Sequence, residues 1–147
     1  MSTAGSGTGA ADAVIRSLQL RPHPEGGHYR ETWRDKPPGG DRGAGTAILY
    51  LLRRGERSHW HRVDATEIWH FHAGAPLALS LPPDGDLPTD RVLGCDLPAG
   101  QLPQLIVPAG AWQAARSLGD WTLAGCTVSP AFEFAGFELA PKGWAPG

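Results

Sequence analysis

The chain has 147 residues with 13 Lys or Arg and 15 Asp or Glu, so its formal net charge is −2 at pH 7. This length predicts one domain with its own core, and the charge excludes the basic surface that nucleic acid or an anionic membrane would require. No apolar run approaches the ~20 residues of a membrane span, and the sequence does not open on a basic segment followed by an apolar one. We therefore expect a cytoplasmic protein whose partner is a small-molecule ligand.

The N-terminal part is predicted to be a disordered segment followed by a short helix. Residues 1–10 are rich in Gly, Ser, Thr and Ala and offer few apolar groups to a core. Residues 11–20 carry apolar side chains at helical spacing, and Pro22 ends the helix. We expect a single domain over residues 11–140 and a tail over residues 141–147.

Strand-like segments dominate the remainder of the chain. Gly and Pro account for 20 and 14 residues, which is typical of strands separated by turns. In residues 28–34, alternation places His28 and Arg30 on one face and Tyr29 on the other. Two cysteines are too few for a disulfide framework, and Cys126 is expected to be a buried thiol. About eight such strands at even spacing predict an all-β barrel or jelly roll.

The side chains that could act as ligands or bases are most concentrated in residues 55–74, which hold four of the six histidines. In an extended strand His59 and His61 project the same way, about 7 Å apart, and a bend after them can return Glu67 to the same place. Two imidazoles and one carboxylate suit a divalent metal with open coordination positions. Without metal, the same trio supplies a base, a second polar contact and an orienting carboxylate. The spacing alone is compatible with either site, and also with exposed or core histidines whose hydrogen bonds are satisfied within the fold.

The strand that begins near Glu67 also carries aromatic residues. Trp69 and Phe71 share the face of Glu67, whereas His70 and His72 point to the opposite face. Trp69 and Phe71 are therefore expected either to pack in the core or to line a ligand cavity inside the barrel.

Several motifs resemble those of a known family. The pattern Gly-x3-His-x-His-x5-Glu-x6-Gly at residues 55–74, followed by PAGAWQ, resembles the two motifs of the cupin superfamily. The segments PHPEGGHYRETWR, SHWHRVDATEIWHFHAG, PQLIVPAGAWQAAR and AGCTVSPAFEFAGFELA, in this order, resemble the small single-domain cupins of the cupin-5 family over residues 20–140. The resemblance implies a double-stranded β-helix, and it makes Glu25, Tyr29 and Arg30 candidates for the pocket rim.

The second motif departs from that of metal-binding cupins, which carry a histidine three residues after the glycine. Gln113 stands in that position here, and a neutral amide is a weaker ligand than an imidazole. Gln113 can instead hydrogen-bond a substrate carbonyl or hydroxyl. Near it, Trp112 is a candidate ligand contact, and Arg116 offers an anion a fork of donors. The metal set implied by the resemblance, for Fe, Mn, Ni or Zn, is His59, His61, Glu67 and Gln113.

Two classes of function remain open from the sequence. The first is an enzyme, either metal-assisted or a metal-free isomerase or epimerase, acting on a small sugar-like or carbonyl-containing metabolite. The likeness of the family to dTDP-keto-sugar epimerases favours proton abstraction beside a carbonyl, with His59 or His61 as base and Glu67 and Tyr29 as further catalytic residues. The second is a non-catalytic protein that binds a small ligand in the same cavity. The apolar, aromatic C-terminal strand predicts a homodimer, because an uncovered sheet edge favours association.

Overall fold

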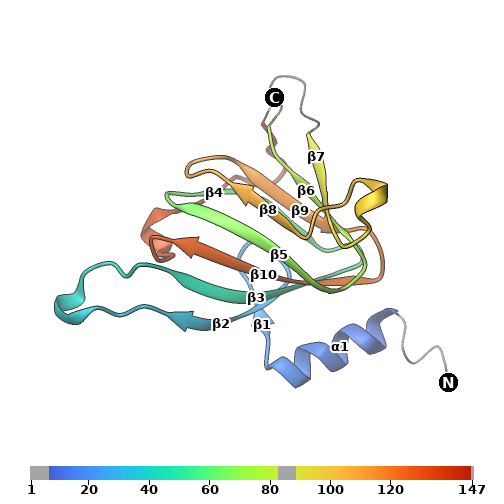
Figure 1. The fold of residues 1–147 in the computed structure, drawn as a ribbon, viewed down its shortest axis with the longest axis horizontal. Coiled ribbons are helices and arrows are strands. Elements are labelled where there is room, and N and C mark those ends of the chain that lie inside the picture. Colours follow the sequence, from blue (N-terminus) through green and yellow to red (C-terminus); the bar gives the residue numbers. More distant parts are fainter. Residues whose placement is uncertain (1–6, 83–88, 147) are drawn as a thin grey trace.

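The computed structural model describes residues 7–82 and 89–146 and places them in two facing β-sheets with one helix outside (Figure 1). The first sheet has six strands in the order β1 (Arg21–Pro22), β2 (His28–Arg34), β3 (Thr46–Arg53), β10 (Trp121–Ser129), β5 (Thr66–Gly74) and β8 (Gln104–Val107). The second has five in the order β11 (Phe137–Leu139), β4 (Arg57–Val63), β9 (Gln113–Ser117), β6 (Leu77–Ser80) and β7 (Asp90–Leu93). Within the described residues, short 3-10 turns lie at Pro38–Gly40, Leu97–Ala99 and Phe134–Gly136.

Neighbouring strands pair antiparallel throughout both sheets. From β3 to β6, and again from β7 to β11, successive strands alternate between the two sheets, so the chain winds around one interior. This confirms the predicted double-stranded β-helix, or jelly roll, with a short N-terminal helix.

The barrel interior is filled at one end by a continuous apolar cluster. Its largest fully buried members are Trp69, Tyr50 and several leucines, which project inward from alternate positions of their strands. Phe71 packs against this cluster. The other end of the interior is lined by polar and aromatic groups.

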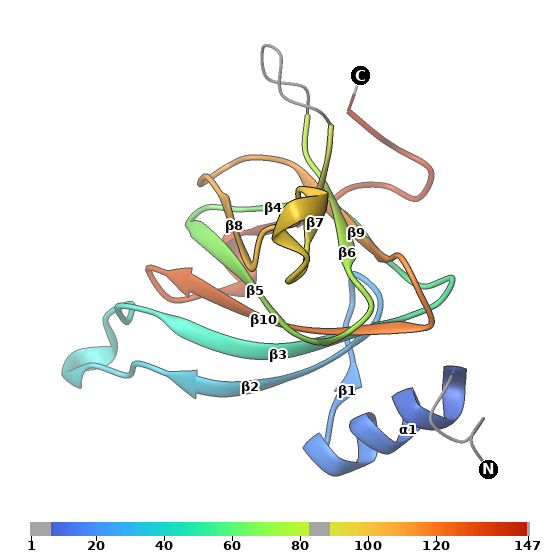
Figure 2. The same cartoon turned by 45° about the vertical axis from the view of Figure 1, so that its right-hand side comes forward.

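Helix α1 (Gly7–Leu18) covers the outside of the first sheet, as the turned view in Figure 2 shows. Ala11 is fully buried with Leu51 of β3, and Val14 packs against the same cluster. The helix begins earlier than the sequence predicted, so residues 7–10, which were expected to be disordered, are its first turn. Residues 1–6 of that segment lie outside the described residues.

Candidate functional site

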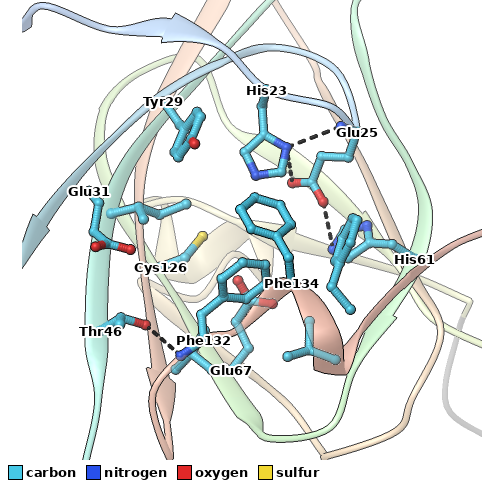
Figure 3. A pocket seen from close by; sticks show the side chains of 14 residues that line it. His23, Glu25, Tyr29, Glu31, Thr46, His61, Glu67, Cys126, Phe132 and Phe134 are labelled. Carbon is cyan, nitrogen blue, oxygen red and sulfur yellow. Dashed lines mark hydrogen bonds and ion pairs between the residues drawn. The ribbon is translucent and has the colours of Figure 1, made fainter. Parts of the chain in front are cut away.

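A cavity opens at the polar end of the barrel, with about 510 Å³ of empty space including the solvent at its mouth. The strands present alternate residues to it, such as 46 and 48 of β3 and 126 and 128 of β10. Figure 3 shows the side chains of the 14 residues that line it. They are His23, Glu25, Tyr29, Glu31, Thr46, Ile48, His61, Val63, Glu67, Cys126, Val128, Phe132, Phe134 and Phe137.

A tight turn over residues 23–27 positions the first carboxyl group of the cavity. The His23 amide donates to the Gly27 carbonyl at 2.9 Å, and the Gly26 amide donates to the His23 carbonyl at 3.0 Å. The turn docks on β4 because the His59 amide donates to the Glu25 carbonyl at 2.8 Å. The Tyr50 hydroxyl donates to the Gly26 carbonyl from the barrel core. The Glu25 side chain is thereby held inside the cavity, with the residue 8% exposed.

Glu25 and His61 form a close pair, with 3.0 Å between Oε2 and Nε2. The His61 Nδ1 donates to the His59 carbonyl at 2.8 Å, since a carbonyl can only accept, and Nε2 of the neutral ring is therefore an acceptor. Burial raises the pKa of Glu25 to about 8, against the opposing effect of the nearby Ser58 and Tyr50 hydroxyls. Burial also lowers the pKa of His61. At pH 7 the pair is thus a neutral carboxyl donating to a neutral imidazole, rather than an ion pair.

His23 is a second neutral imidazole at the cavity. Its Nδ1 accepts a hydrogen bond of 3.1 Å from the Glu25 amide, so its own proton is on Nε2. Burial, and secondly the neighbouring His61, lower the pKa of His23 to about 4. Its ring packs edge-on against Tyr29 with 4.4 Å between centroids. Tyr29, a predicted catalytic residue, therefore does line the cavity.

Glu67 is held by a chain of buried hydrogen bonds. The Trp69 indole N–H donates to Gln113 Oε1 at 2.8 Å, and Gln113 Nε2 donates to Glu67 Oε1 at 2.8 Å. Because an indole is only a donor, it fixes the orientation of the amide and aims the NH2 group at the carboxyl. Burial, as the largest cause, raises the pKa of Glu67. The Glu67 carboxyl also interacts with the Cys126 thiol, and it lines the cavity.

His59 and His61 do not share a face, and the prediction that they do is wrong. In the pairing of β4 with β9, Ser58 lies opposite Ala115 and His61 opposite Gln113. Between these two pairs, two residues of β4 therefore lie opposite a single residue of β9, which is a β-bulge. Because the extra residue shifts the alternation, Ser58 and His61 both point inward. His59 instead contacts the Pro141 carbonyl through Nε2 at 3.0 Å.

The family model Cupin_5, described as cupin superfamily (DUF985), matches residues 12–140. This chain belongs to the cupin-5 family. Among solved structures, the cupin is 42% identical to protein SO0799 of Shewanella oneidensis, with a TM-score of 0.81 over 88% of this chain and 84% of that one. It is 32% identical to a hypothetical protein from Leishmania major, with a TM-score of 0.78 over 88% and 86%.

More distant solved structures are similar to this chain in fold alone. KdgF from a Halomonas species is 13% identical with a TM-score of 0.55, over 76% of this chain and 86% of that one. A variant of oxalate decarboxylase from Bacillus subtilis is 11% identical with a TM-score of 0.60, over 80% and 29%. No curated protein matches the chain significantly. Within the described residues, no helix has both the length and the apolar character to cross a membrane.

The donor set predicted for a metal in this cupin does not converge. His59 is directed to the C-terminal segment, and the only ligand atom of Gln113, Oε1, accepts the Trp69 hydrogen bond. Nε2 of His61 faces Glu25. In the part of the chain that the structure describes, no three His, Cys, Asp or Glu side chains are placed to hold a metal ion. The residues present therefore do not fit the predicted metal centre.

Three of the predicted ligand contacts of this cupin lie on the outside of the barrel. Arg30 is exposed and donates to the Leu18 carbonyl at 3.4 Å. Trp112 packs against Trp144 with 4.6 Å between ring centroids. Arg116 is exposed and lies 3.5 Å from Asp90.

Several cavity residues were missed from the sequence. His23 was not predicted, because a side chain in a turn has no periodicity that assigns it to a face. Cys126 was expected only to be buried, yet its thiol lines the cavity. Phe132, Phe134 and Phe137 close the mouth from the C-terminal segment. The clustering of His23 with Glu25 in the PHPEGG turn was the available signal.

Replacing Gln113 by Leu is expected to lower the free energy of unfolding by about 2 kcal/mol, because it leaves the Trp69 N–H and the Glu67 carboxyl buried without their partner. Denaturant titration measures this loss. Gln104→Leu is the matched control, since Gln104 is exposed and bonds only to His70 on the outer face. Equal stability of the two variants would contradict the hydrogen-bond chain.

Proposed function

We propose that this cupin is a cytoplasmic small-molecule enzyme of the isomerase or epimerase type, acting inside the barrel on a small sugar-like or carbonyl-containing metabolite. The observation that carries the proposal is the 3.0 Å pair of Glu25 and His61 inside an aromatic-walled cavity. A neutral acid touching a neutral base, with the pKa of the acid raised to about 8, is suited to proton transfer near neutral pH.

The pair can act on a carbonyl compound as acid and base together. The Glu25 carboxyl gives its proton to the carbonyl oxygen, and the His61 Nε2 takes a proton from the adjacent carbon. The substrate becomes an enol, while the pair becomes an ion pair of carboxylate and imidazolium. When the adjacent carbon carries a hydroxyl group, this enol is an enediol. His61 then returns its proton to the former carbonyl carbon while the second hydroxyl gives its proton to Glu25, which yields the isomeric carbonyl compound and restores the neutral pair. The Nδ1 bond to the His59 carbonyl keeps the His61 ring in the required tautomer.

Glu67 supports the stereochemical part of the proposal. Burial raises its pKa, which favours the protonated form that can donate, and Gln113 holds one of its oxygens. A proton delivered to the carbon from Glu67 rather than from His61 would invert the configuration. No step is assigned to a metal, because the predicted donors do not fit one. Elemental analysis of protein purified without chelator measures metal content directly.

Solvent deuterium exchange tests the proposed reaction. The protein is incubated in D2O with a panel of small aldoses, ketoses and keto acids, and loss of the carbon-bound proton is followed by NMR. We expect His61→Asn to slow exchange by about 100-fold or more, because the base is removed. His59→Asn is the matched control and is expected to retain exchange, since only its backbone groups contact the site.

The outcomes separate the two functional classes. Exchange that survives in His61→Asn would contradict the assigned base. A panel member that binds in the cavity without exchange would support the non-catalytic binding protein instead. Homodimerisation stays a prediction of the sequence, and light scattering at micromolar concentration measures it.

A further inference from the structure

The cavity is lined by several acidic side chains, and histidine is the basic residue type among its described lining residues. Three carboxyl side chains line it, those of Glu25, Glu31 and Glu67, and the described lining residues include no lysine or arginine. Glu31 lies at the mouth, where Arg34 binds it from outside at 2.8 Å. A phosphate or carboxylate ligand would therefore meet no fixed positive charge on the lining residues.

Much of the remaining cavity wall is aromatic. Phe132 and Phe134, both labelled in Figure 3, pack edge to face with 4.9 Å between their ring centroids. Phe134 and Phe137 pack in the same way with 5.9 Å between centroids. Tyr29 adds a fourth ring at the cavity. Aromatic faces carry negative charge density and attract ammonium groups, with the largest effect where water is excluded.

The pKa values of the titratable groups in the cavity also favour a cationic ligand over an anionic one. A cation that needs an ionised Glu25 must first remove its proton. At pH 7 this lowers the affinity for the cation only about tenfold relative to a site that is already ionised, because the pKa of Glu25 is about 8. An anion that needs a protonated His23 loses about a thousandfold in affinity at pH 7 relative to a site that is already protonated, because the pKa of His23 is about 4. Burial lowers the pKa of His61 in the same direction.

We propose that the cavity binds a small organic cation, an amine whose ammonium group lies against Glu25 and Glu67 and whose carbon skeleton packs on the phenylalanine wall. For the reaction proposed above, the substrate class is then an amine-bearing carbonyl compound or sugar without phosphate. The inference rests on that cavity being the ligand site. Its test measures binding alone, so a failure of turnover and a failure of cation preference are distinguishable.

Cation binding is coupled to proton release. Glu25 ionises when the ammonium group arrives, so about one proton leaves the protein below pH 8 and affinity rises with pH up to that value. The groups that face Glu25 are the two imidazoles of His23 and His61, the hydroxyls of Ser58 and Tyr50, and the Glu67 carboxyl. In the empty cavity the imidazoles are neutral at pH 7, so the carboxyl groups set the charge of the site.

Calorimetry with matched ligands tests the proposal on the full chain. One series is glucosamine, glucose and glucose phosphate, which share a ring and differ in charge, and a second pair is choline and its uncharged isostere dimethylbutanol. We expect each ammonium compound to bind at least about tenfold more tightly than its neutral counterpart, and glucose phosphate to bind least. Titration in two buffers of different ionisation enthalpy is expected to show release of about one proton.

The variant Glu25→Gln removes the carboxylate that would balance the charge of the ammonium group. Its amide can still donate to His61 Nε2, so the turn and the pair keep their shape, but the preference for ammonium compounds and the proton release are expected to disappear. Glu138→Gln, outside the cavity, is expected to keep both. Neutral or anionic members that bind as tightly as the amines, or no ammonium compound binding at millimolar concentration, would overturn the proposal.

Discussion

The Glu25→Gln variant is expected to gain stability relative to the wild type as the pH rises from 4.5 to 8, by up to about 5 kcal/mol. Glu25 is buried and its pKa is raised from 4.5 to about 8. Between these values the folded wild type keeps a proton that the unfolded chain has already released. Since the folded state binds more protons, the free energy of unfolding of the wild type falls as the pH rises. The variant lacks this titration.

His23 acts in the opposite direction over a lower range. Its pKa is lowered from 6.5 to about 4, so the unfolded chain binds the extra proton, and stability is lost as the pH falls through that window. The two groups nearly offset each other between pH 4.5 and 6.5, and Glu25 alone acts from 6.5 to 8. Urea unfolding of the wild type and of Glu25→Gln between pH 4.5 and 8 measures the difference between their free energies of unfolding. Curves that remain parallel would show that Glu25 is ionised in the folded state.

The second large effect is expected at Gly26, in the turn that carries Glu25. Gly26→Ala should reduce the free energy of unfolding by about 4 kcal/mol. Gly26 has φ of 113°, and an added Cβ would lie 1.9 Å from the Arg57 carbonyl oxygen, a backbone atom that cannot rotate away. Relief of that overlap requires the turn to move off β4, which also separates Glu25 from His61.

Gly55→Ala is the matched control for this prediction. Gly55 also has positive φ, at 83°, but an added Cβ would meet nothing within 4 Å. It therefore carries only the backbone cost, about 1 kcal/mol. Denaturant titration of the two variants separates the backbone cost from the overlap. Similar losses in both variants would mean that the turn is not docked as described.

The fold and half of the site follow from patterns that the sequence displays openly. Simple alternation along β5 placed Glu67 and Trp69 inside the barrel and His70 outside, as the structure has them. In β4 the same rule failed, because a bulge between Ser58 and His61 is invisible in a single sequence and reverses the face of His59. One inserted residue thus removed a predicted ligand from the cavity.

The remaining cavity groups depend on contacts between distant segments. Glu25 reaches His61 only because its turn docks on β4, which no local pattern encodes. Gln113 was recognised as a departure from metal-binding cupins, but its role in linking Trp69 to Glu67 required the packing of β9 against β5. Periodicity assigns faces within a strand, whereas a site is assembled across strands and turns.

The proposed reaction depends on Glu25 and His61 forming a neutral acid and base pair inside the cavity. NMR titration of the histidine ring nitrogens and of the glutamate side-chain carboxyl carbons measures the protonation state of both groups. We expect a neutral His61 at pH 7 with its proton on Nδ1, and a Glu25 carboxyl with a pKa of about 8. A doubly protonated His61 beside an ionised Glu25 at pH 7 would contradict it, because the site would then be an ordinary buried ion pair.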